Sequence, residues 1–212
     1  VVSLSGEVGK RVSAAFNDIN VVIMNIVTMV MNIAPYVVFV LMAKLFATIG
    51  LDTILGLAKY FFLLAGLLVM HAFVTYPIIF KVLSGLNPLI LLRKMRNTAL
   101  FAFSTSSSNA TLPITMDTAK NRLGVNSSVS SFTIPLGATI NMDGTAIMQG
   151  VATVFIAQVY GVDLSVSDFL MVILTATLAS IGTAGVPGVG LIMLAMVLQQ
   201  VNLPVEGIAL II

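Results

Sequence analysis

The chain has 212 residues, of which 58% are hydrophobic and only 8% are charged, and its mean hydropathy is +1.10. Soluble domains carry roughly 25% charged residues, so this composition indicates an integral membrane protein. Several charge-free runs approach or exceed the roughly 20 residues that span a bilayer as a helix, which favours an all-α fold. A net charge of +2 gives no reason to expect nucleic-acid binding. The lack of cysteine excludes disulfides, thiolate metal sites and cysteine nucleophiles, and a single histidine excludes a histidine-based metal cluster.

Residues 1–50 are predicted to contain one spanning helix. The apolar run from about Val12 to Phe46 carries Pro35, which a membrane helix tolerates with a kink. The opening residues lack both an initiator Met and a signal-peptide pattern, and the last residues, Gly207 to Ile212, lie in a fresh apolar run. We therefore expect a fragment that lacks membrane helices at both ends.

The second region, residues 51–212, is predicted to open with a spanning helix over residues 51–83. The following segment, Lys81 to Arg96, has four basic residues and no acidic one, so it is predicted to face the cytoplasm. If the predicted spans alternate across the membrane on either side of this segment, eight basic residues lie on the cytoplasmic side and only Lys44 and Lys59 lie on the outer side.

A first hairpin is predicted over residues 88–122. Its central segment, Thr98 to Met116, is uncharged but is interrupted by STSSSNAT and by Pro113. Serine and asparagine compete for backbone hydrogen bonds and oppose a continuous helix facing lipid. Irregular backbone at membrane depth is tolerated only where protein or a water-filled cavity covers it, which favours a re-entrant hairpin.

A broken spanning helix is predicted over residues 127–161, and it contains the sequence PLGATINMDG. Asp143 is the only charged residue between Ser131 and Gly161. A carboxylate at bilayer depth costs several kcal/mol unless something pairs with it, so Asp143 is predicted to be functional. Asn141 and Gly144 beside it suit a local unwinding of the helix.

A second hairpin is predicted over residues 165–203, followed by the start of a last helix at residues 204–212. The apolar run Phe169 to Val205 is about twice the length of one membrane span and carries the helix-breaking sequence SIGTAGVPGVG at its centre. The two predicted hairpins would enter the membrane from opposite sides, which indicates an inverted repeat.

Three polar, helix-breaking segments thus accompany Asp143: Ser104 to Thr111, Gly137 to Thr145 and Ser180 to Gly190. Unwound carbonyls with a carboxylate are hard oxygen ligands suited to Na⁺, and the N-termini of half-helices favour an anion. A cation-coupled anion carrier would use both. The alternative is that the small residues serve close helix packing and the hydroxyls hold helices together.

His71 lies within an apolar span and is interpreted as a hydrogen-bonded packing residue, with a proton relay as the alternative. A rival hypothesis is an intramembrane serine hydrolase that uses His71 with a hairpin serine. We expect no partner carboxylate near His71, and the sequence has no Gly-x-Ser-x-Gly elbow, so this hypothesis is disfavoured. A passive channel remains a second rival, distinguished by flux without ion coupling.

Three motifs resemble the dicarboxylate/amino acid:cation symporter family, which includes glutamate transporters and C4-dicarboxylate carriers. They are SSSNATLPIT (Ser106 to Thr115), PLGATINMDGT (Pro135 to Thr145) and ASIGTAGVPG (Ala179 to Gly188). The resemblance implies an elevator-type secondary active transporter with an inverted repeat, a homotrimer in the bacterial inner membrane, in which residues 1–50 end the scaffold and residues 51–212 form part of the transport domain.

The resemblance also implies site residues. Substrate contacts would come from Ser106, Ser108, Met142 and Thr145 and from the gate residues Gly185, Val186 and Gly190. One Na⁺ would be bound by Gly137, Asn141 and Asp143, and another by Thr139, Ser180, Ile181 and Thr183.

The implied function is Na⁺-coupled symport of an acidic amino acid or a C4-dicarboxylate, and the implied protein is not an enzyme. Proton coupling, or a neutral amino acid as substrate, is the alternative within the family. Some archaeal members carry a substrate-reading arginine where this chain has Ser106. We expect that arginine in a last helix beyond Ile212.

Overall fold

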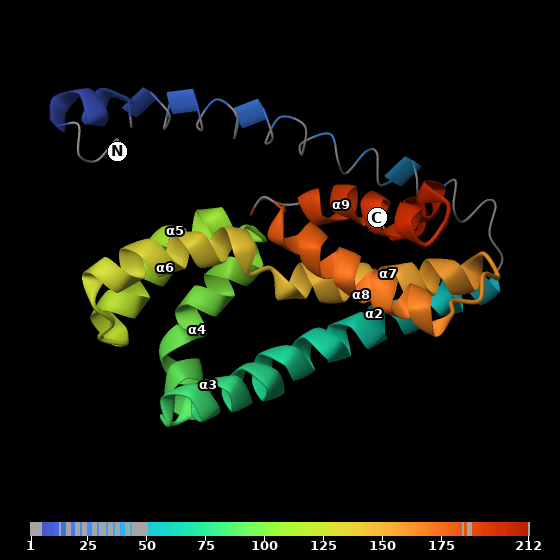
Figure 1. Cartoon of the computed structure of the whole chain (residues 1–212), viewed down its shortest axis with the longest axis horizontal. Coiled ribbons are helices and arrows are strands. Elements are labelled where there is room, and N and C mark those ends of the chain that lie inside the picture. Colours follow the sequence, from blue (N-terminus) through green and yellow to red (C-terminus); the bar gives the residue numbers. More distant parts are fainter. Residues whose placement is uncertain are drawn as a thin grey trace. The chain divides into compact units, whose positions relative to one another are not determined.

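The computed structural model describes residues 51–211 except 184, 186 and 187, together with residues 6–12 and scattered positions up to residue 43. The chain divides into two compact units, residues 1–50 and residues 51–212. The described residues of the first unit are helical, and the predicted kink at Pro35 lies outside them. Throughout the described parts of both units, all regular secondary structure is helical (Figure 1).

The second unit begins with a long helix made of three consecutive parts: α2 (Leu51–Met70), a π-helical turn (His71–Thr75) and α3 (Tyr76–Ser84). Its stretch Gly56–Ser84 has 29 residues and a mean hydropathy of 2.0, and it is long and apolar enough to cross a membrane. The helix ends where Gly85 adopts a left-handed φ of 69°, with its N–H donating to the Lys81 carbonyl.

The next two helices, α4 (Pro88–Thr105) and α5 (Ser108–Asp117), form a hairpin, and a π-helical turn (Thr118–Arg122) extends its second arm. The predicted interruption lies at Ser106, whose φ is 49°, and Ser107 then caps α5 by accepting from the Ala110 N–H. Pro113 lies inside α5, so the prediction that it also interrupts the helix is wrong. The helix accommodates Pro113 because one missing N–H does not stop the turns on either side.

Helix α6 (Ser127–Ile140) runs beside α5, and α7 (Asp143–Val159) continues beyond a break of two residues (Figure 1). The break consists of Asn141 and Met142, neither of which has helical backbone angles.

A second pair, α8 (Val166–Ile181) and α9 (Val189–Gln200), packs against α7 and is followed by a 3₁₀ turn (Val205–Leu210). Ser165 and Asp168 form a reciprocal capping box at the start of α8. Hydrogen bonds from the Ser165 hydroxyl and N–H lower the pKa of Asp168, which precedes the apolar run.

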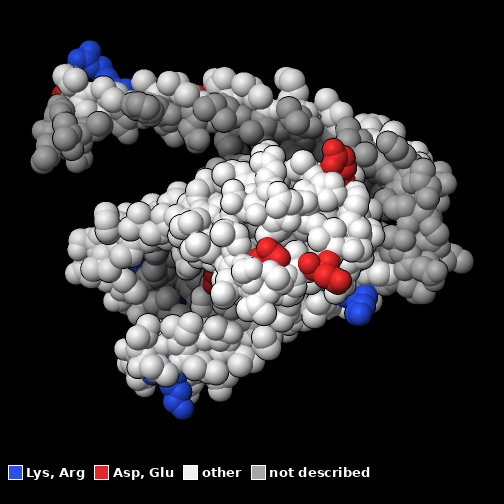
Figure 2. Space-filling view, turned by 45° about the vertical axis from the view of Figure 1, so that its right-hand side comes forward, with Lys and Arg blue, Asp and Glu red and all other residues white. Residues whose placement is uncertain are grey.

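The core of the second unit lies between α7, α8 and α9. Ile156, Leu194, Val197 and Leu198 are fully buried there, together with the small residue Ala152. Lipid is as apolar as these side chains, so close van der Waals packing between helices, rather than removal from water, stabilises such a core in a membrane. Outside it, charged side chains are few on the face seen in Figure 2.

Gly207, in the 3₁₀ turn, lies so close to this core that even a methyl group does not fit. A Cβ there would lie 2.5 Å from Cγ2 of Ile156, which is fully buried and β-branched. We expect Gly207→Ala to destabilise the protein by about 1–3 kcal/mol through overpacking, measured as a lower apparent melting temperature in detergent.

Gly66→Ala is the matched control, because a Cβ at Gly66 meets nothing within 4 Å and alanine is the better helix former. A Gly207→Ala protein as stable as the Gly66→Ala protein would contradict the packing of the turn on α7.

Candidate functional site

A cavity of about 650 Å³ brings together segments that lie far apart in the sequence. It lies at the tip of the α4–α5 hairpin, the break between α6 and α7, and the connection between α8 and α9, with part of α2 as a further wall. The polar and glycine residues that line it are Ser106, Ser108, Asn141, Asp143, Gly144, Thr145, Thr183, Gly185, Gly188 and Gly190.

The structure gathers most, but not all, of the residues predicted from the sequence. Of the predicted substrate contacts, Ser106, Ser108, Met142, Thr145, Gly185 and Gly190 line the cavity, and Val186 lies outside the described residues. Of the predicted ion ligands, Asn141, Asp143 and Thr183 line it.

The other predicted ion ligands, Gly137, Thr139, Ser180 and Ile181, are not among the residues that line it. Gly137 lines a separate cavity against α4 and α5. The Thr139 hydroxyl donates to the Leu136 carbonyl, and the buried Ser180 hydroxyl donates to the Thr177 carbonyl. Ile181 is 44% exposed.

The two helix interruptions at either side of the cavity contact each other directly. The carbonyl of Gly185 accepts from the buried Ser107 hydroxyl at 2.8 Å and from the Asn109 N–H at 3.2 Å. A Cβ on Gly185 would lie 3.0 Å from Oδ1 of Asn109, so glycine permits this close approach. The tip of the first hairpin is therefore bonded to the connection between α8 and α9.

The break at Asn141 and Met142 redirects backbone hydrogen bonds. In a continuous helix the Gly144 N–H would donate to the Ile140 carbonyl and the Thr145 N–H to the Asn141 carbonyl. Instead, they donate to Oδ1 of Asp143 and to the Met142 carbonyl. The carbonyl oxygens of Ile140 and Asn141 thereby lose these helical hydrogen bonds next to the carboxylate of Asp143.

Asp143 is held by two side chains of the long helix Leu51–Ser84. Its Oδ2 lies 2.5 Å from Nε2 of His71 and accepts from the Tyr76 hydroxyl, also at 2.5 Å. The prediction that His71 has no carboxylate nearby is wrong, because helix packing closes a separation of 72 residues. A lone histidine and a lone aspartate, each in an apolar run, were the available signal, since both need a partner.

Gln149 is a further polar residue that the sequence did not single out. It is fully buried in α7, and its Nε2 donates to the Gly190 carbonyl at 2.9 Å. Its Oε1 has no hydrogen-bond partner in the described part of the chain. This amide ties the start of α9 to the helix that carries Asp143.

The chemistry of the cavity suits a monovalent cation beside an anion. Within the described residues, no three His, Cys, Asp or Glu side chains come together as they would around Zn²⁺ or Ca²⁺. One carboxylate with hydroxyl and carbonyl oxygens remains. Three helices, α5, α7 and α9, also begin at the cavity, and their N-termini favour negative charge.

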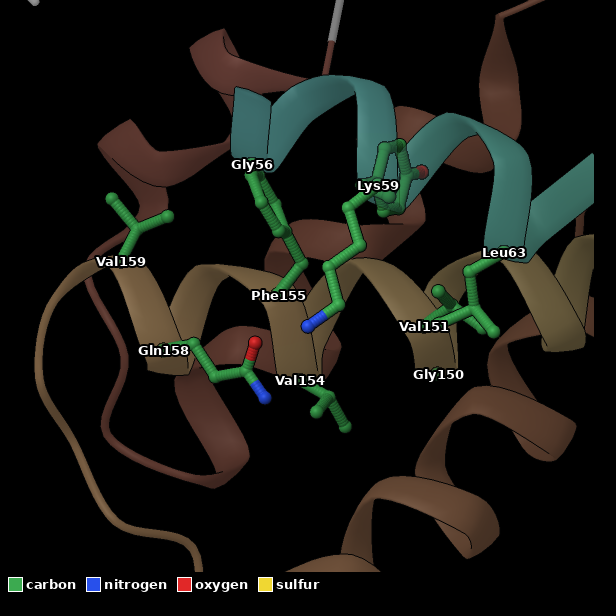
Figure 3. A pocket seen from close by; sticks show the side chains of 10 residues that line it. Gly56, Lys59, Leu63, Gly150, Val151, Val154, Phe155, Gln158 and Val159 are labelled. Carbon is green, nitrogen blue, oxygen red and sulfur yellow. The ribbon is translucent and has the colours of Figure 1, made fainter. Parts of the chain in front are cut away.

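A second cavity, of about 700 Å³, lies between α2 and α7 and contains none of the predicted site residues. Figure 3 shows Lys59 extending from α2 across α7 toward Gln158, among apolar side chains. Because it lacks both Asp143 and the hairpin tips, it is not the candidate site.

Comparison with known proteins places this architecture in a family. The profile of the sodium:dicarboxylate symporter family matches residues 1–212. The chain belongs to this family. It is therefore part of a family of membrane transporters, and not of a family of hydrolases.

Curated members of the family are similar over most of this chain. An excitatory amino acid transporter of Caenorhabditis elegans is 44% identical over 193 residues, which cover 90% of this chain and 38% of that protein. Excitatory amino acid transporter 3 of Mus musculus is 37% identical over 213 residues, which cover 100% of this chain and 41% of that protein. The chain thus spans about two fifths of the length of these relatives.

Proposed function

We propose that this chain forms part of a secondary active transporter that couples uptake of an acidic amino acid or a C4-dicarboxylate to Na⁺. The observation that supports this function most directly is the cavity in which Asp143, freed carbonyls and three helix N-termini come together. The family description names sodium and dicarboxylate, and the similar animal proteins are named as excitatory amino acid transporters.

In this proposal the two kinds of ligand occupy neighbouring parts of the site. The substrate would contact Ser106, Ser108, Met142 and Thr145 and would be enclosed by Gly185, Val186 and Gly190. One Na⁺ would bind Gly137, Asn141 and Asp143, and a second would bind Thr139, Ser180, Ile181 and Thr183. The assignments of Asn141, Asp143 and Thr183 as ion ligands have the stronger support, because these three residues line the cavity and the other four do not.

We also propose how the full-length carrier moves and assembles. The pairs α4–α5 and α8–α9 would be re-entrant hairpins that enter from opposite sides, and residues 51–212 would belong to a transport domain moving as an elevator against a scaffold that includes residues 1–50. The full-length carrier would be a homotrimer in a bacterial inner membrane, although the relatives described above come from animals. Proton coupling is the alternative to Na⁺.

The deciding experiment is uptake by the full-length carrier reconstituted in liposomes. We expect radiolabelled aspartate, glutamate or succinate to accumulate with an inward Na⁺ gradient and not with an inward choline gradient. Accumulation driven by a proton gradient without Na⁺ would select proton coupling instead. Flux that needs no ion gradient would contradict symport and favour a channel.

A further inference from the structure

The long helix Leu51–Ser84 departs from α-helical geometry where it meets Asp143. The π-helical turn covers His71–Thr75, and the Tyr76 N–H closes it by donating to the His71 carbonyl, five residues back. Short π-helical turns are rare and often lie at functional sites. This one lies between the two residues whose side chains bind the carboxylate.

Pro77 gives a local reason for the wide turn. Proline has no N–H to donate, and its ring clashes with the carbonyl four residues earlier, which here belongs to Phe73. The π-helical turn that precedes Pro77 moves the backbone away from that clash. Pro77 therefore favours a widened turn at this point of the helix.

The turn changes which side chains share a face of the helix. At 3.6 residues per turn, two residues five positions apart point roughly 140° away from each other. A hydrogen bond between residues five apart instead stacks them one turn above the other. The rings of His71 and Tyr76 accordingly lie side by side, with centroids 4.7 Å apart, and both reach the same oxygen of Asp143.

We propose that the π-helical turn makes His71 and Tyr76 positioning residues for the coupling ion. They hold Oδ2 of Asp143, so Oδ1, whose one contact within the described residues is the 3.2 Å hydrogen bond from the Gly144 N–H, is the oxygen presented to Na⁺. The inference rests on the proposed function, and it adds two residues outside the three helix-breaking segments to the machinery of that site.

The test separates ion affinity from turnover in the full-length carrier. Tyr76→Phe removes one hydroxyl and leaves the ring, so we expect the Na⁺ concentration for half-maximal uptake to rise about tenfold, as for a lost hydrogen bond to a charged group. Maximal uptake at saturating Na⁺ should change less than about twofold, because the substituted ring fills the same space.

Tyr160→Phe is the matched control, since it makes the same chemical change at an exposed tyrosine outside the candidate site. Equal half-saturating Na⁺ in the Tyr76→Phe and Tyr160→Phe carriers would overturn the proposal. A lower maximal rate at unchanged half-saturation would also overturn it, because that result indicates a purely structural role.

A second variant tests whether the two residues act through one oxygen. His71→Gln is also expected to raise half-saturating Na⁺, and the two changes together should raise it by less than the product of the single effects. Strictly multiplicative effects would contradict the shared oxygen. If neither variant accumulates, infrared difference spectra of the wild-type carrier decide, since Na⁺ should shift the tyrosine C–O band and an unshifted band overturns the proposal.

The same measurements distinguish this inference from the proposed function. A wild-type carrier without Na⁺-dependent uptake would refute the proposed function itself. A Na⁺-dependent wild type whose Na⁺ affinity is insensitive to Tyr76 and His71 would refute only the positioning role.

Discussion

Asp143→Asn is expected to abolish Na⁺-dependent uptake by the full-length carrier. The substitution keeps the shape of the side chain and removes the one acidic group among the described residues that line the candidate cavity. Sodium would then meet a neutral amide. One of the two carboxylate oxygens, of which Oδ2 bonds His71 and Tyr76, would become an NH₂ group. We expect uptake at saturating substrate to fall at least about 100-fold, which corresponds to roughly 2.8 kcal/mol.

The matched control is Asp163→Asn, the same change at an exposed carboxylate in the connection between α7 and α8. Its uptake and its Na⁺ dependence should stay close to those of the wild type. The assignment of Asp143 as the coupling carboxylate would be refuted by an Asp143→Asn carrier that keeps wild-type uptake and the same dependence on Na⁺.

The local parts of this site could be predicted because they depend on a few adjacent residues. Ser106 and Ser107 interrupt the helix between α4 and α5, and Asn141 and Met142 separate α6 from α7, within the segments whose polar and glycine residues predict breaks. Such breaks follow from competition for backbone hydrogen bonds, which needs no tertiary context.

Contacts between distant segments could not be predicted in the same way. The approach of His71 to Asp143 and the bond from Gln149 to the Gly190 carbonyl depend on how whole helices pack. A polar side chain in an apolar span needs a hydrogen-bond partner, but this requirement alone does not show which residue pairs with His71. Pro113 shows the opposite error, since a strong local breaker lies within an intact helix.

Tyr76 illustrates a third limit. In a regular helix it would point away from His71, so an analysis based on a period of 3.6 residues assigns the two residues to different faces. Only the π-helical turn places them together. Pro77 was visible in the sequence, but proline alone does not distinguish a kink from a widened turn.

The second large effect is expected from Gly190→Ala, at the start of α9. A Cβ on Gly190 would lie 2.9 Å from Cγ2 of Thr145, a residue that lines the candidate cavity. Thr145 has a stiff, β-branched side chain, so the clash must move either this side chain or the first turn of α9. Overpacking of about 1–3 kcal/mol at the site predicts a loss of substrate affinity of about five- to 140-fold, measured as the substrate concentration for half-maximal uptake.

The structure also specifies the change that should reverse this loss. Thr145→Ser removes the methyl group that the new Cβ would meet and keeps the hydroxyl, so the carrier with both Gly190→Ala and Thr145→Ser should recover to within about threefold of the Thr145→Ser carrier. Gly150→Ala on α7, where a Cβ meets nothing within 4 Å, should leave affinity unchanged. If the serine gives no recovery, the contact between α9 and the broken helix is not what sets substrate affinity. Full recovery would show that this contact causes the loss, and an unchanged apparent melting temperature of the Gly190→Ala carrier would show that the loss arises in the binding site rather than from lower stability.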